Sequence, residues 1–474
     1  MRKHCQLFIA LALLTLNFAF AKDENAYSLK VRVNGIKDTV CFLANYYGDK
    51  QYLKDTAKVD SKGNFTFDGK EKLPGGIYLV VLPGKKYFEL VIPSDNEQNF
   101  SVETDTTDYI RFMKVKGSNE NKLFYEFLNF LGKKSRAVDS LKKEIKKSPK
   151  DSVSLTKKMM DIDKEVQSYR KDFIKNNSNL FITKVFKASE EVDVPEVPIL
   201  ANGKKDSTFQ YRFYKEHFFD NIDFSDERMI RTPIFHSKIE KYIKNLVIQI
   251  PDSLTKEIDF IVNKARKSKE LFKYCVWYLN YTYETSQLMG MDAVFVHMAK
   301  KYYLTKDVDW VDSTIKAKFK EKAETLEPLL LGKVAPNTYL SDTLGNIIQL
   351  HSLKADYVIL VFWDPNCGHC QKEIPKLHEW LVKKNDKRII VYSVSIERKD
   401  SDFKKFIREK KLTSFINVWD KYTYTDFRKM WDIYSTPVIY IVDKNKKIIA
   451  KRLGAEQIDE FLTNYEKLEA KKAK

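Results

Sequence analysis

Cysteine is scarce in this chain, which has only five among 474 residues. A fold built on disulfides needs a far denser set at this length, so the sequence excludes a disulfide scaffold. Beyond residue 21 no stretch approaches the roughly 20 apolar residues of a membrane-spanning helix. Histidine is also rare, and His217, His236 and His297 lack the spacing typical of metal ligands. Ordinary hydrophobic cores must therefore stabilise the fold, and the length predicts more than one of them.

The N-terminus has the pattern of a secretory signal peptide. Arg2 and Lys3 precede an apolar run over residues 7–20, and small residues at positions 19 and 21 suit cleavage. We expect residues 1–21 to be removed, together with Cys5. No cysteine follows the apolar run, as a lipoprotein would require. The mature protein is therefore predicted to be exported to the periplasm or cell envelope, and to be soluble there.

Basic residues exceed acidic ones, with a formal net charge of +18 for the full sequence. Loss of Arg2 and Lys3 would lower this to +16, and the remaining excess is mostly lysine spread along the chain. Such a distribution is typical of a solvated basic surface. Nucleic acid is an unsuitable partner for an exported protein, whereas an anionic membrane surface or acidic partners remain open alternatives.

Three regions follow the predicted signal peptide, so the expected fold is multi-domain. Residues 22–116 contain short β-branched and aromatic stretches separated by turn residues, which predicts an N-terminal β-sandwich-like domain. Residues 117–332 have apolar residues at helical spacing and predict a helical middle domain. Residues 333–474 alternate strand and helix patterns, which predicts a C-terminal α/β domain.

One helix of the middle region carries a heptad-like seam. Such a seam suits a long helix packed on another helix, or a short coiled-coil arm that could support a homodimer. Its apolar positions alternate in steps of four and three: Leu155, Met159, Ile162, Val166, Tyr169 and Phe173. Cys41, in a predicted strand, and Cys275, in an aromatic helix, are expected to be buried and inert.

The motif WDPNCGHC at residues 363–370 places two cysteines between an apolar strand and a helix. A helix beginning at His369 would put Cys367 at its N-terminus, where unpaired N–H groups and the helix dipole favour a thiolate. Cys370 would lie one turn further in and be less exposed. Cys367 can then attack a substrate disulfide, and Cys370 can resolve the mixed disulfide.

Other uses of this cysteine pair fit the sequence less well. Zinc usually takes four protein ligands, whereas here one pair has only His369 and His378 nearby. A structural disulfide that closes so small a loop removes little entropy from the unfolded chain. A thiol peroxidase needs Thr or Ser three residues before the reactive cysteine and proline seven before, where this chain has Asp364 and Leu360. A redox-active disulfide is therefore predicted, with no metal and no other cofactor.

Residues 333–474 resemble the exported TlpA/ResA type of thiol–disulfide oxidoreductase. The resemblance implies a thioredoxin fold, with a cis proline whose preceding backbone faces the cysteines and can pair with an extended substrate chain. It rests on a WxPxCxxC frame, a glutamate three residues beyond it, and a Thr-Pro pair before a late strand: Trp363, Pro365, Cys367, Cys370, Glu373, Thr436 and Pro437.

Two further residues bear on the chemistry. Many thioredoxins bury an acid six residues before the first cysteine, where this chain has Val361, so Glu373 could manage the proton of the resolving thiol instead. Glu373 could equally be a solvated helix residue. The Cys-Gly-His-Cys motif resembles that of protein disulfide isomerases, and the imidazole of His369 could stabilise the thiolate and make the disulfide more oxidising.

The expected function is exchange of disulfides with envelope proteins, which the resemblance extends to reduction of apocytochromes before haem attachment. A membrane electron donor or acceptor would renew the cysteine pair. Isomerase or oxidase work is the alternative. A second alternative makes the N-terminal modules the main actor, as a binding scaffold, because their order resembles that of accessory modules in Bacteroides-like envelope proteins.

Replacing His369 with proline tests the first alternative. The reduction potential of the variant should be more negative, because the variant loses the imidazole that favours the thiolate. The shift should stay within roughly 90 mV, the difference between the potentials of thioredoxin and protein disulfide isomerase. Equilibration of the cysteine pair with glutathione gives the potential. An unchanged potential in this variant would contradict the role assigned to His369.

Overall fold

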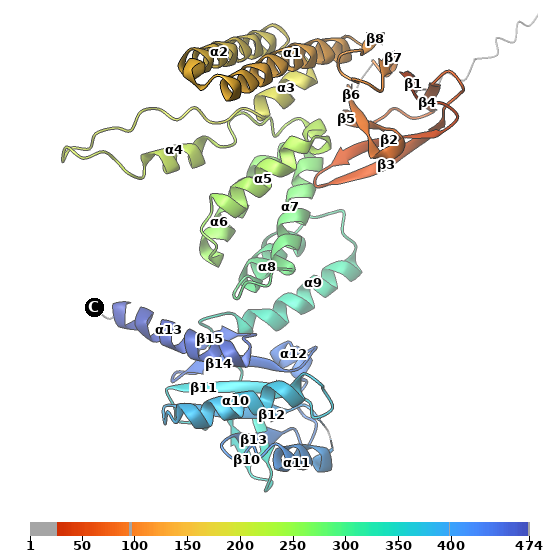
Figure 1. Cartoon of the computed structure of the whole chain (residues 1–474). Coiled ribbons are helices and arrows are strands. Elements are labelled where there is room, and N and C mark those ends of the chain that lie inside the picture. The colour runs from red at the N-terminus through yellow and green to blue at the C-terminus, as the bar shows by residue number, and fades with distance from the viewer. Residues whose placement is uncertain (1–25, 94–96, 398, 473–474) are drawn as a thin grey trace, which may run out of the picture. The chain divides into compact units, whose positions relative to one another are not determined.

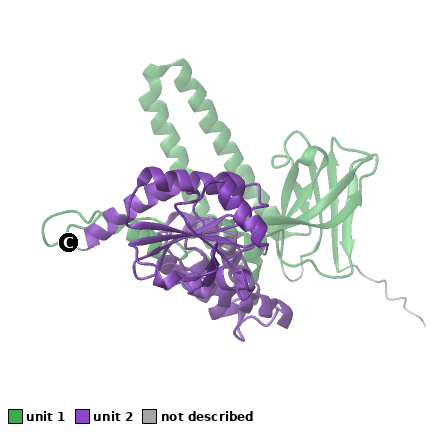
Figure 2. Cartoon of the chain, turned by 90° about the horizontal axis from the view of Figure 1, so that it is seen from below, with its two compact units in different colours: residues 1–238 green, residues 239–474 purple. Residues whose placement is uncertain are grey.

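The computed structural model describes residues 26–93, 97–397 and 399–472 of the chain. The predicted signal peptide lies outside these residues. The chain divides into two compact units, residues 1–238 and 239–474, which Figure 2 colours green and purple. Across the described ranges, no helix has both the length and the apolar character needed to cross a membrane.

The first unit begins with two four-stranded sheets, ordered β4-β1-β7-β8 and β3-β2-β5-β6 (Figure 1). Alternate residues of β1 are buried, among them Leu29 and Val31, so each sheet has one core-facing side. This confirms the strand-rich N-terminal region. The strands are β1 (Tyr27–Asn34), β2 (Val40–Tyr47), β3 (Lys50–Lys58), β4 (Asn64–Gly69), β5 (Gly76–Val81), β6 (Tyr87–Ile92), β7 (Asn99–Asp105) and β8 (Lys114–Lys116).

Helices follow: α1 (Asn119–Lys147), α2 (Ser152–Asn176), α3 (Phe181–Ala188) and α4 (Phe209–His217). α1 packs against α2, so the predicted packing of one long helix on another is confirmed. Aromatic rings pack between these two helices, with the Phe127 and Phe173 rings 4.9 Å apart and the Phe130 and Tyr169 rings 3.8 Å apart. Only Leu155 and Phe173 of α2 are fully buried, so most of the seam stays partly exposed. A homodimer through it stays a prediction.

The helical region continues across the boundary of the units. Its helices are α5 (Pro233–Asn245), α6 (Pro251–Ala265), α7 (Lys269–Glu284), α8 (Asp292–Met298) and α9 (Ser313–Leu326). α7 is a core helix, and Cys275 at its centre is fully buried. Cys41 in β2 is fully buried as well, so the predicted burial of both thiols is confirmed.

The end of the chain forms a seven-stranded sheet in the order β10-β9-β13-β12-β11-β14-β15. β11 pairs in parallel with β12 and antiparallel with β14, and Figure 1 shows it near the middle of the sheet. The strands are β9 (Tyr339–Asp342), β10 (Ile347–Gln349), β11 (Tyr357–Trp363), β12 (Ile389–Ser395), β13 (Ile416–Trp419), β14 (Val438–Asp443) and β15 (Ile448–Lys451). The helices are α10 (Cys370–Lys384), α11 (Asp400–Glu409), α12 (Phe427–Trp431) and α13 (Ile458–Lys472).

Two hydrophobic cores cover the two faces of this sheet. Ile359, Val361 and Trp363 of β11 enter the core that contains residues of α10, α11 and α13. The alternate residues Leu360 and Phe362 enter the other core, which contains Trp431 and Tyr440. A strand buried on both faces must be apolar throughout, which explains the unbroken apolar run of β11. The thioredoxin-like α/β fold expected of this region is confirmed.

Truncation of a β11 side chain should therefore destabilise the second unit. Phe362 is fully buried and its ring lies 5.2 Å from that of Trp431, so Phe362→Ala should cost about 3–5 kcal/mol in unfolding free energy. Leu344→Ala is the control, since that side chain is 85% exposed and should change stability by less than about 0.5 kcal/mol. Urea denaturation followed by tryptophan fluorescence measures both. Equal effects would contradict the two-core description.

Candidate active site

The cysteine pair lies at the carboxyl end of β11, where the strand turns into α10. The side-chain carboxylate of Asp364 accepts a hydrogen bond from the Asn366 backbone at 2.7 Å. The backbone carbonyl of Asp364 accepts a second one from the Cys367 backbone at 3.1 Å. α10 begins at Cys370, with His369 as its N-cap. The predicted helix start at residue 369 is thus one residue early, because residue 369 is the cap. Cys367 precedes the first helical turn instead of lying within it.

Cys367 is nevertheless placed where a thiolate is favoured. Burial by itself would raise its pKa, but hydrogen bonds from the Cys370 backbone, the Thr436 and Cys370 side chains and the His369 backbone bring the pKa below that of an ordinary cysteine. The backbone N–H groups at the start of α10 thus supply the stabilisation that a helix N-terminus was expected to give. Cys367 is only half-buried, so a substrate can reach its sulfur.

Cys370 has the opposite environment. Its side chain is fully buried, and burial raises the pKa of its thiol to about 12. A protonated, enclosed thiol next to a partly exposed one with a lowered pKa is the asymmetry that two-step disulfide exchange needs. Both thiols are free in this structure, which corresponds to the reduced form of the pair.

The segment at Thr436 comes from 69 residues further along the chain and faces Cys367. The Thr436–Pro437 peptide bond is cis, as the sequence predicts. The Cys367 thiol donates a hydrogen bond to the Thr436 carbonyl oxygen, with 3.2 Å between sulfur and oxygen. The fold therefore brings this backbone segment next to the reactive sulfur, where an extended substrate chain would approach.

Trp363 and Pro365 position the cysteines from behind. The Trp363 side chain is fully buried, stacks on Phe406 with ring centroids 4.5 Å apart, and donates a hydrogen bond from Nε1 to Ser393 Oγ at 2.7 Å. Pro365 is buried too, and its carbonyl accepts a hydrogen bond from the Gln371 side chain at 3.1 Å. Both residues hold the turn in place and do not reach toward substrate.

His369 and Glu373 lie on the outer side of the helix start. His369 is exposed, and its side chain makes no capping hydrogen bond to α10. The Glu373 carboxylate accepts a hydrogen bond from Lys376 Nζ at 2.8 Å and is 28% exposed. This ion pair is what the alternative of a solvated helix residue implies, so the role of Glu373 in proton transfer stays a prediction, as does the influence of His369 on the potential.

Two supporting residues escaped sequence reasoning. Ser393 of β12 fixes the Trp363 indole, and Glu397 accepts a hydrogen bond from Asn366 Nδ2 at 2.9 Å. Ser393 stands in an otherwise apolar strand, so a polar residue at a buried position was the available signal. Glu397 gives no such signal, because it lies in a loop 31 residues from its partner.

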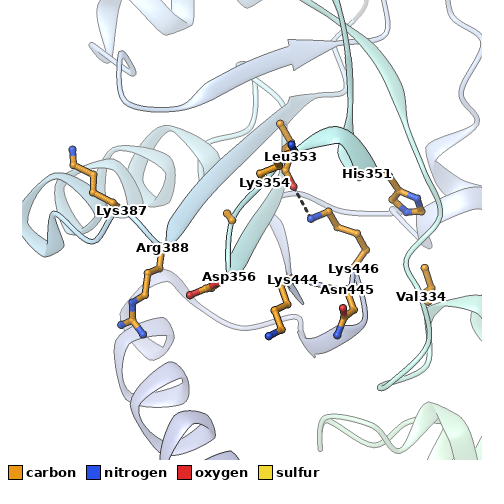
Figure 3. A pocket seen from close by; sticks show the side chains of 11 residues that line it. Val334, His351, Leu353, Lys354, Asp356, Lys387, Arg388, Lys444, Asn445 and Lys446 are labelled. Carbon is orange, nitrogen blue, oxygen red and sulfur yellow. Dashed lines mark hydrogen bonds between the residues drawn. The ribbon is translucent and has the colours of Figure 1, made fainter.

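A basic hollow of about 690 Å³ lies at the end of the strands opposite to the cysteines (Figure 3). Its lining comes from residues 353–356 just before β11, from Lys387 and Arg388 just before β12, and from the β14–β15 turn. The cysteines follow the other end of β11, so this hollow takes no part in their chemistry. No group of three or more potential metal-ligating side chains occurs among the residues that the structure describes.

Comparison with known proteins gives three family matches along the chain. Residues 331–451 match the AhpC/TSA family, residues 142–327 match a domain of unknown function (DUF5106), and residues 27–124 match another (DUF4369). A thiol-disulfide oxidoreductase ResA of Bacillus cereus is 31% identical over 142 residues, which are 29% of this chain and 78% of that protein. The chain belongs to the ResA-type family of thiol-disulfide oxidoreductases.

Two solved structures are similar to parts of this chain. A domain of a possible thiol-disulfide isomerase from Cytophaga hutchinsonii is 54% identical and covers 31% of this chain and 99% of that chain, with a TM-score of 0.30. A thioredoxin-like protein from Bacteroides caccae is 21% identical and covers 57% of this chain and 99% of that chain, with a TM-score of 0.45. As a member of the ResA-type family, the chain is a thiol-disulfide oxidoreductase.

The different pKa values of the two thiols predict selective alkylation. Iodoacetamide at neutral pH should modify Cys367 in the reduced protein and leave Cys370 unmodified, because only the thiolate reacts. The rate at Cys367 should rise with pH around a pKa below the ordinary value of about 8.5. Mass spectrometry of quenched samples locates the label. The urea-denatured protein is the control, because all of its cysteines should react with the pH dependence of an ordinary thiol. The same pH dependence for Cys367 in the folded protein would refute the prediction.

Proposed function

We propose that this chain is exported and exchanges disulfides with proteins of the cell envelope through Cys367 and Cys370. The observation that carries the proposal is the placement of Cys367, half-buried, with a lowered pKa, and 3.2 Å from the Thr436 carbonyl. The fully buried Cys370 supplies the second thiol. The signal-peptide pattern of residues 1–21 supports export.

In the reducing direction, the Cys367 thiolate attacks one sulfur of a substrate disulfide. A mixed disulfide between Cys367 and the substrate forms, and the other substrate sulfur leaves and takes up a proton. Cys370 then loses its proton and attacks the Cys367 sulfur, which releases the second substrate thiol. The substrate gains two electrons and the cysteine pair loses two. A membrane electron donor would reduce the pair again, and Glu373 is the proposed carboxylate for the Cys370 proton.

Apocytochromes before haem attachment are one proposed class of substrate. Isomerase or oxidase work is the second candidate, and the Cys-Gly-His-Cys sequence favours it because His369 would raise the potential. The description of the Cytophaga hutchinsonii relative as a possible thiol-disulfide isomerase points the same way. The two candidates use the same cysteines and differ in the direction of electron flow.

The equilibrium of the cysteine pair with glutathione distinguishes these candidates. A potential below about −250 mV indicates a reductase, and one above about −200 mV indicates an isomerase or oxidase. Quenching with acid and alkylation of the free thiols gives the reduced fraction at each glutathione ratio. A pair that never forms a disulfide under these conditions would contradict both candidates.

Replacement of both cysteines by serine tests whether the redox centre carries the biological role. The Cys367→Ser, Cys370→Ser protein should lose disulfide exchange with a protein substrate entirely, because both the nucleophile and the resolving thiol are gone. Cys275→Ala is the matched control and should retain exchange, since that thiol is buried in α7, away from the β11–α10 turn. Full biological activity of the double variant would instead assign the main role to residues 22–332 as a binding scaffold.

A further inference from the structure

The loop between α7 and α8 lines a cleft whose lining also includes Tyr434, two residues before Thr436. The cleft has a volume of about 780 Å³, within the range of ligand-binding clefts. One side is formed by residues 286–290 of the loop and by α9, and the other by Asp432, Tyr434, Arg452 and Leu453 of the thioredoxin-like domain. All of these residues belong to the second compact unit.

This cleft lies at the same end of the sheet as the cysteines, because Phe362 at the end of β11 pairs with Val438, and the Arg452 backbone bonds to the Ile439 carbonyl. Tyr434 lies two residues before Thr436, a span of about 7 Å of extended chain, and the Thr436 carbonyl contacts Cys367. Leu453 and Met289 pack against the same hydrophobic core as Cys367. A substrate chain that approaches Cys367 along the Thr436 segment would therefore enter the cleft within a few residues of its reacting cysteine.

Several bonds fix the helical side of the cleft relative to the sheet. Lys451 of β15 is 7% exposed, forms an ion pair with Asp292 at the start of α8, and donates a hydrogen bond to the Leu329 carbonyl at 2.8 Å. The linker, residues 330–338 between the helical region and β9, pairs with β15. Its backbone hydrogen bonds run from Gly332 to Ile448 and from Ile448 to Lys333, both 2.8 Å long. These bonds fix the start of α8 and the segment after α9 against β15.

The loop itself has a defined shape. Gly290 has φ of +88°, and a Cβ at this position would lie 3.0 Å from a Leu331 methyl carbon, so a larger residue would be strained there. The Ser286 side chain accepts a hydrogen bond from the Leu288 backbone at 3.2 Å. These contacts present Leu288 and Met289 to the cleft as a fixed pair.

The charges of the cleft are largely neutralised among themselves. Glu284 pairs with Lys322 at 2.7 Å, Asp432 pairs with Arg452 at 2.6 Å, and Asp292 pairs with Lys451. Its unusual feature is exposed apolar surface, because Leu288 is 58% exposed and Tyr434 is 71% exposed. Large exposed apolar side chains in the lining of an open cleft favour an apolar ligand group.

We propose that the loop at residues 286–290 forms one wall of the protein-substrate cleft, and that Leu288 and Met289 select extended segments with an apolar side chain near the reacting cysteine. The inference rests on the proposed disulfide exchange and adds a substrate preference to it. The helical region would then take a direct part in substrate recognition, because the side chains that discriminate between substrates belong to it.

Two symmetric peptide disulfides test this preference, each made of two copies of a short peptide with one cysteine. Leucines flank the cysteine in one peptide and aspartates replace them in the other. The reduced protein should release thiol from the leucine peptide about tenfold faster, a discrimination typical of an apolar pocket. Chromatography of quenched samples measures the rates, so no spectroscopic label enters the cleft.

Lysine substitutions in the loop then distinguish a loss of substrate recognition from a loss of folding. Leu288→Lys and Met289→Lys should each lower the leucine-to-aspartate rate ratio at least fivefold and speed the reaction of the aspartate peptide, a gain that misfolding cannot produce. Leu344→Lys, at an exposed apolar position outside the cleft, should keep the original ratio.

The outcomes also separate this inference from the proposed function. If the original protein reduces both peptides and neither lysine variant changes the ratio, the assignment of the loop to the substrate cleft is wrong while disulfide exchange stands. If the original protein reduces neither peptide nor glutathione disulfide, the proposed exchange itself is wrong and the substrate preference with it.

Discussion

Burial of β11 on both faces is the constraint on which the active site depends. Its odd and even residues enter two separate cores, so the strand can neither shift its register nor tilt without exposing apolar surface. Trp363, the last residue of the strand, is held by Ser393 and Phe406. The turn that carries Cys367 therefore starts from a fixed point. The reactivity of the cysteine pair follows from that rigidity, because hydrogen bonds to a thiolate help only when the donors stay in place.

The two thiols differ in environment more than in position. They are three residues apart, yet one has hydrogen-bond donors and access to solvent while the other is enclosed by the core. A long helix behind Cys370 and the Thr436 segment in front of Cys367 produce this difference. The same arrangement can carry electrons in either direction, so the direction depends on the reduction potential of the pair relative to those of its partners.

Much of this site could be predicted from the sequence, because its signals are local. The apolar run of β11, the CxxC pair and the Thr-Pro dipeptide lie within short segments and have specific physical roles. The predicted start of α10 at residue 369 falls on its cap, one residue before the helix begins. Ser393 and Glu397 were missed because their partners are about 30 residues away. The loop at residues 286–290 lies within the predicted helical middle domain, and no local pattern connects it with the cleft residues that follow more than 140 residues further along the chain.

The linker between the helical region and the thioredoxin-like domain has a second consequence. Lys333 bonds to Ile448 at the start of β15, Ala335 bonds to Lys446 in the preceding turn, and Val334 forms a bridge with Lys447. The linker therefore acts as a short extra strand beside the β14–β15 turn and the start of β15. Unpaired strand edges invite pairing with other chains. A thiol–disulfide enzyme meets partly folded proteins in the course of its work, and these carry exposed strands of their own. Because the start of β15 is already paired, this part of the sheet edge offers such clients fewer free backbone groups.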